Sequence, residues 1–131
     1  MMPDQTDKAG TIRLEGPDGD RDAQLHTLTV AAELTGRRDL PMVSWSLSPY
    51  TDRKWGTNEY ETYPTLHGHL HQFGERNNRA ALAMWAAAFG AGATEEQPNQ
   101  HIHVITRFTV RGVPVKIVAV FKPGEPGEPD R

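Results

Sequence analysis

Apolar positions recur with a helical period in two segments of the chain. Residues 22–36 are expected to form a first helix, with Asp22 as its N-cap and Gly36 just beyond its last turn. Leu25, Leu28, Ala31 and Ala32 share one face of this helix, while Val30 and Leu34 lie on the other side. A second helix begins at Asn77 or Asn78 and ends at two glycines; its apolar stripe and these glycines are Leu82, Trp85, Ala86, Phe89, Gly90 and Gly92.

Four other segments alternate between apolar and polar residues, which is typical of half-buried strands. They are Met42–Ser48, Thr65–Gln72, His101–Val110 and Val113–Phe121. The last two join across Arg111 and Gly112, and pairing Val110 with Val113 puts nearly every large apolar side chain on one face. Because Pro114 has no N–H, we expect the last strand to be an edge strand at that position.

The order of these elements, α-β-β-α-β-β, predicts a single α+β domain over residues 22–122. We expect a four-stranded, mostly antiparallel sheet with both helices on one face. Residues 1–21 and 123–131 contain few large apolar residues and many acidic, Gly or Pro residues. Such segments bury too little surface to offset the entropy of ordering, so both are predicted to be disordered tails.

Composition excludes several classes of protein. The 131 residues include no Cys, which excludes a disulfide scaffold, a cysteine-ligated metal site and a thiol nucleophile. No apolar run approaches the roughly 18 residues that a membrane span needs, and the first residues lack the apolar stretch of a signal peptide. We therefore expect a cytoplasmic protein without a membrane partner. The net charge of −3 comes mainly from the two tails, so the domain is close to neutral.

Four stretches of the domain resemble small uncharacterised proteins encoded in actinobacterial genomes, plasmids and phages. These stretches are LPMVSWSLS (40–48), LHGHL (66–70), AALAMWAAAFGA (80–91) and VRGVPVKIVAV (110–120). They cover 37 of the 131 residues and are core-forming patterns. The resemblance implies a fold and a mobile-element or phage setting, and it supplies no catalytic residues.

Histidines form the first candidate site. Five of the six histidines lie in two short strand segments, at His67, His69, His71, His101 and His103. Two histidines at i and i+2 on a strand project from the same face about 7 Å apart, a spacing that metal sites use. These histidines could therefore hold a divalent metal. The alternative is a set of solvated side chains on the polar face of a sheet, because no acidic residue lies nearby in the sequence to orient a metal-bound imidazole.

Basic residues on the same predicted face form the second candidate site. In the register above, Arg107 and Lys116 lie directly opposite each other. Like charges paired in this way destabilise a sheet unless an anion joins them. With the histidines, this face has many donors and no carboxylate, which suits phosphate or an acidic partner. The alternative is an ordinary solvated sheet face, which the small number of formal charges favours.

The predicted loop Pro49–Pro64 is the third candidate. It is long for a connection between paired strands, and it concentrates the residue types that dominate binding hot spots. The candidate binding residues here are Tyr50, Arg53, Lys54, Trp55, Tyr60 and Tyr63. The alternative is that these rings fold back over the edge of the sheet as a structural cap.

These observations predict a non-catalytic interaction module, an accessory or regulatory protein of a mobile element or phage. It would bind a protein or nucleic-acid partner, and two copies of the chain could also associate. No cofactor is expected in this interpretation. The alternative function is a small metal-dependent enzyme or metal-binding protein that uses the histidines of HGHLH (67–71) and HIH (101–103). Phosphate-loop and nucleophile-elbow motifs are absent from the sequence, and no acidic pair suited to hydrolysis is evident, so we expect no enzyme activity.

Overall fold

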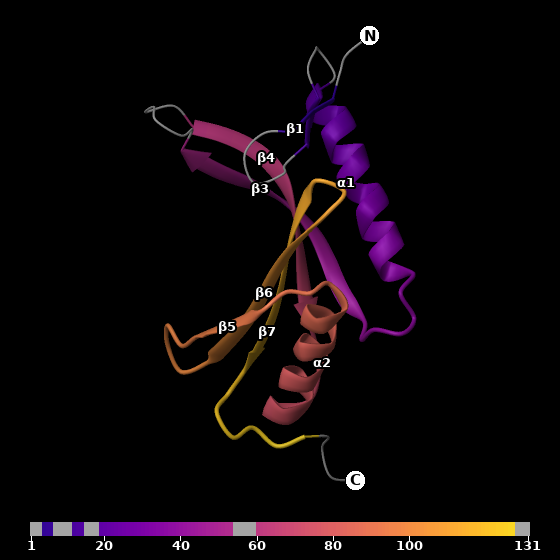
Figure 1. Cartoon of the computed structure of the whole chain (residues 1–131). Helices are drawn as coiled ribbons and strands as arrows, with labels where there is room; N and C mark the ends of the chain where they lie inside the picture. The colour runs from indigo at the N-terminus through magenta and orange to yellow at the C-terminus, as the bar shows by residue number, and fades with distance from the viewer. Residues whose placement is uncertain (1–3, 7–11, 15–18, 54–59, 128–131) are drawn as a thin grey trace.

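The computed structural model describes residues 4–6, 12–14, 19–53 and 60–127, and side chains within 21–47 and 64–127 (Figure 1). In these ranges the chain is α+β, with two helices, a short hairpin and a five-stranded mixed sheet. The elements are β1 (Asp4–Thr6), β2 (Ile12–Leu14), α1 (Gly19–Thr35), β3 (Val43–Arg53), β4 (Tyr60–Leu70), α2 (Gly74–Ala88), β5 (Ala93–Glu96), β6 (Ile102–Val110) and β7 (Val113–Phe121). No helix among the described residues has both the length and the apolar character to cross a membrane.

The large sheet has the strand order β3-β4-β7-β6-β5. All neighbouring strands are antiparallel except β4 and β7, which run parallel over Leu66–Leu70 and Val115–Ala119. The α+β class is therefore confirmed, whereas the prediction of four strands is wrong by one. The additional strand, β5, is short and fully exposed, so it carries no alternation of apolar and polar residues.

The β6–β7 hairpin has the predicted register, from Ile102 opposite Phe121 to Val110 opposite Val113. Arg111 and Gly112 both have positive φ, 49° and 81°, as a two-residue turn of this type requires. As predicted, β7 is an edge at Pro114, which pairs with β6 alone, whereas over Val115–Ala119 β7 lies between β4 and β6. Its pairing with β4 begins at Val115, directly after Pro114, so the missing N–H removes no bond from that ladder.

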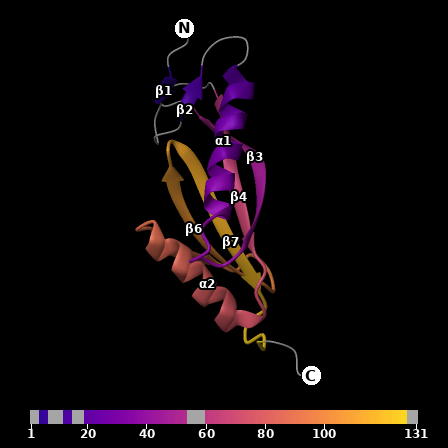
Figure 2. The ribbon, with the colours of Figure 1, turned by 90° about the vertical axis from the view of Figure 1, so that its right-hand side faces the viewer.

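Both helices lie on one face of the large sheet, as predicted (Figure 2). A single apolar core joins them to the sheet. Its largest buried members are Val30, Leu66, Leu82, Trp85, Val115, Ile117 and Phe121. The predicted stripe of α2 is confirmed, since Leu82, Trp85 and Ala86 are buried and Phe89 packs against the core.

The ends of the helices differ from the sequence-based expectation. Asp22 does not cap α1, because the helix already begins at Gly19. Asn77 and Asn78 lie inside α2, which follows Phe73. Asn78 is buried, and its amide nitrogen donates to the carbonyl of Gly74 at 2.7 Å and to that of Gln72 at 3.2 Å. This amide thus fixes the connection between β4 and α2 from within the helix.

The face that α1 turns toward the core is the one with Val30 and Leu34. Both are buried, together with Ala23 and Thr27, whereas Leu25 and Leu28 are 56% and 50% exposed. The hydroxyl of Thr27 donates to the carbonyl of Ala23, which satisfies this polar group inside the core. Of the predicted apolar face, Leu25 and Leu28 therefore point to solvent, whereas Ala31 packs against the core.

Parts of the two predicted tails carry defined structure. The β1–β2 hairpin and the first turn of α1 lie within residues 1–21. After β7, the backbone of Glu125 accepts a hydrogen bond from Glu75 N–H, and Gly124 N–H donates to the Glu75 carboxylate. These contacts dock residues 122–127 on the start of α2. The remaining tail residues lie outside the described ranges.

Candidate functional site

The helices cover one face of the large sheet, and no described helix covers the other, which we call the helix-free face (Figure 2). Strand register places side chains on this face in rows across the sheet. One row is polar and basic: Ser46, His67, Lys116 and Arg107. The next row is apolar at its centre: Ser44, His69, Val118, Ile105 and Thr94. A third row contains Val120, His103 and Glu96.

The basic row confirms the predicted pairing of Arg107 with Lys116. Arg107 is exposed and Lys116 is half-buried. No carboxylate among residues 21–47 and 64–127 forms an ion pair with either side chain. Two neighbouring cations without an anion repel each other, so the row is a site where a bound anion would relieve unfavourable energy.

The pKa of His67 is lowered by burial and by the positive charges of this row. Burial, followed by the charges of Lys116, His69 and Arg107, lowers the pKa of His67 below its ordinary value of 6.5. Each of these causes disfavours the imidazolium form. At neutral pH, His67 therefore presents a neutral ring beside two permanent cations.

This lowered pKa predicts a pH dependence of stability. Below about pH 6.5 this histidine binds a proton more readily in the unfolded chain than in the folded protein. The free energy of unfolding therefore decreases as the pH is lowered. A His67→Gln variant lacks this contribution. Urea denaturation of both proteins between about pH 7.5 and pH 5 should show the wild type losing more stability than the variant. Parallel curves would mean that His67 titrates normally in the fold.

The helix-free face is not free of carboxylates, which corrects the sequence-based picture. Strand β5 places Glu96 opposite His103. Glu96 is two strands from Lys116 and lies in a different row from Arg107, so the basic row keeps its character. The acidic residue was missed because β5 itself was not predicted.

The histidines spread over this face. The rings of His69 and His71 are stacked with centroids 6.4 Å apart, and His103 lies across β7 on β6. Within the described residues, no group of three or more His, Asp or Glu side chains is arranged to hold a metal ion. The geometry therefore lends no support to a metal centre, and the metal hypothesis remains a prediction.

The predicted loop at residues 49–64 is mostly a two-stranded arm. β3 continues to Arg53 and β4 begins at Tyr60, so that Tyr50 pairs with Tyr63 and Arg53 with Tyr60. Residues 60–65 of β4 pair only with β3, because the ladder with β7 begins at Leu66. The arm extends beyond the rest of the sheet (Figure 1). Lys54 and Trp55 lie outside the described residues.

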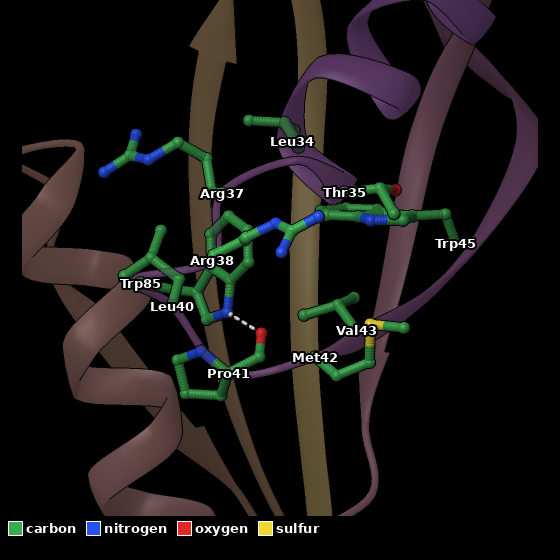
Figure 3. A pocket seen from close by; sticks show the side chains of 10 residues that line it. All are labelled: Leu34, Thr35, Arg37, Arg38, Leu40, Pro41, Met42, Val43, Trp45 and Trp85. Carbon is green, nitrogen blue, oxygen red and sulfur yellow. Dashed lines mark hydrogen bonds between the residues drawn. The ribbon is translucent and has the colours of Figure 1, made fainter.

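A pocket of about 340 Å³ on the helix side of the sheet was not anticipated from the sequence. It lies between the end of α1, the connection of residues 36–42, the start of β3, and Trp85 of α2 (Figure 3). Trp45 and Trp85 meet edge to face, with centroids 5.7 Å apart and rings at 83°. The sequence features that could have indicated this pocket are two tryptophans in segments predicted to face the core and the adjacent arginines Arg37 and Arg38.

Comparison of the chain with family models, with curated proteins and with solved structures finds no match. The resemblance to actinobacterial and phage proteins stays a prediction.

Proposed function

We propose that this protein is a non-catalytic interaction module that binds an anionic partner, foremost a nucleic acid, through the helix-free face. In the setting that the sequence resemblance implies, it would be an accessory or regulatory protein of a mobile element or phage. The partner's phosphates would lie along the basic row Ser46, His67, Lys116 and Arg107. The hydroxyl and imidazole groups add hydrogen-bond donors to the two charges.

The observation that carries this proposal is the pairing of Arg107 with Lys116 on the helix-free face of the sheet. A directly paired Arg and Lys is unfavourable in the free protein, and a phosphate between them converts repulsion into two attractive contacts. In the neighbouring apolar row, Ile105 and Val118 are 4% and 8% exposed, so their side chains are closely packed beside the two cations. The phosphate backbone would supply the affinity along these three rows, because none of their residues is Phe, Tyr or Trp.

The proposal is tested by fluorescence anisotropy with labelled 20-nucleotide single-stranded DNA and RNA over a range of salt concentrations. Affinity should fall as salt rises, since each neutralised phosphate releases counterions. In the variant Arg107→Gln/Lys116→Gln, affinity should fall about tenfold or more. The salt slope should become shallower by about 1.4, corresponding to two single-strand phosphate contacts.

A matched control is Arg21→Gln/Arg76→Gln, which removes the same charge from exposed positions on the two helices. This control should bind like the wild type. Equal weakening of both double variants would assign binding to net charge and contradict the proposed face. Binding of polyglutamate through Arg107 and Lys116, without binding of either nucleic acid, would make the partner an acidic protein instead.

A further inference from the structure

The pocket on the helix side has the dimensions and lining of a small-molecule site. Ligand pockets are concave, mostly apolar and fitted with a few placed polar groups, and about 340 Å³ lies at the small end of their range. Trp45 supplies an accessible aromatic wall with the buried Trp85 packed edge to face against it, and Leu40 and Met42 supply accessible aliphatic surface. Trp85 is 1% exposed and its indole N–H donates to the Pro41 carbonyl at 2.9 Å, so this wall is fixed in place (Figure 3).

Two arginines line the pocket, and they are not equivalent. Arg37 makes a two-point contact with Asp39, with distances of 2.9 and 2.8 Å, and its guanidinium lies 5.5 Å from the centre of the Phe89 ring. This contact lowers the pKa of Asp39, as expected for a committed pair. Arg37 therefore has a partner already.

Arg38 is the cation available to a ligand. It is exposed, and no carboxylate among residues 21–47 and 64–127 forms an ion pair with it. In Figure 3 its side chain extends across the pocket in the direction of Trp45, whereas that of Arg37 points away. The side chain of Met42, 74% exposed, lies at the rim, where a flexible thioether can adapt to a bound ring.

From this arrangement we infer that the pocket binds a small planar aromatic carboxylate. The ring lies against Trp45, next to the buried Trp85, and the carboxylate pairs with Arg38. A cationic ligand is disfavoured by the two arginines. This site is independent of the proposed partner-binding face, which lies on the opposite side of the sheet.

The test compares two probes of nearly equal shape, 2-naphthoate and its neutral amide, 2-naphthamide. Amide and indole N–H resonances of the full chain are followed by NMR during titration. The carboxylate should bind with a Kd of about 1 mM or tighter, shift the indole resonances of Trp45 and Trp85, and bind at least about fivefold more tightly than the amide.

Three variants separate the parts of the inference. Arg38→Gln should remove the preference for the carboxylate while the amide binds as before, and Arg76→Gln, an exposed arginine on α2, should keep the preference. Met42→Glu, at an exposed position, should weaken the carboxylate selectively. No binding of either probe, equal binding of both, or an unchanged preference in Arg38→Gln would each overturn the inference. These outcomes leave the nucleic-acid test untouched, because that test depends on Arg107 and Lys116 on the opposite side of the sheet.

Discussion

Replacing Trp85 with alanine should lower the free energy of unfolding by about 3–5 kcal/mol. Trp85 is 1% exposed and contacts aromatic rings on two sides. It meets Trp45 edge to face and stacks with Phe89 at a centroid distance of 6.0 Å. Its neighbours along α2 are mostly alanines, which are too small to fill the resulting cavity. The variant also leaves the Pro41 carbonyl without its indole donor.

Urea denaturation followed by far-ultraviolet circular dichroism measures this loss. Met84→Ala is the matched control, because Met84 is adjacent on α2 and 47% exposed. The control should stay within about 0.5 kcal/mol of the wild type. A loss below about 1 kcal/mol for Trp85→Ala would show that α2 does not pack on the sheet through this face.

Replacing Gly68 with alanine should lower the free energy of unfolding by about 1–3 kcal/mol, as overpacking does in a filled core. Gly68 lies opposite Trp45 in the β3–β4 ladder. A Cβ at this position would come within 2.7 Å of the Trp45 ring and also collide with the side chain of Val43. The absence of a side chain at Gly68, the central residue of LHGHL (66–70), therefore leaves room for the Trp45 indole.

Gly92→Ala provides the control for this change, because a Cβ there meets nothing within 4 Å and Gly92 has no positive φ. Thermal unfolding should give a clear decrease in the melting temperature for Gly68→Ala and almost none for Gly92→Ala. Equal melting temperatures for wild type and Gly68→Ala would mean that Trp45 can move aside at little cost, and that the aromatic wall of the pocket is not rigid.

The parts of the fold that the sequence predicted well are those held by local patterns. The β6–β7 hairpin followed from alternation that puts residues such as Val104 and Ile117 on one face, and from a two-residue turn with glycine. The stripe of α2 followed from its helical period. The face of α1 could not be chosen in the same way, because apolar residues lie on both of its sides and only packing decides between them.

Longer-range features were beyond such patterns. The parallel pairing of β4 with β7 joins residues 49 positions apart in the sequence, such as Leu66 and Val115, and leaves no local signal. Pro49 and Pro64 suggested the ends of strands, yet they face each other as one pair in the β3–β4 ladder. Strands β3 and β4 therefore continue past this pair, although neither proline has an N–H. Most of the segment predicted as a loop forms a two-stranded arm instead.

The candidate sites divide along the same line. The pairing of Arg107 with Lys116 could be predicted because it depends only on the hairpin register. Glu96 and the pocket could not, since they depend on an exposed strand and on how the connection of residues 36–42 packs against Trp45 and Trp85. A pocket formed by three separate elements has no signature in any single segment.

The central position of β7 has a consequence for how the protein folds during synthesis. β7 is the last strand in chain order, yet it joins the β3–β4 pair to the β5–β6 pair. Until Phe121 has left the ribosome, β4 and β6 each expose an unpaired edge, and the two halves share no ladder. Nascent chains of this protein should therefore stay open to proteases and to strand-capturing chaperones until β7 emerges, and then become protected in one cooperative step.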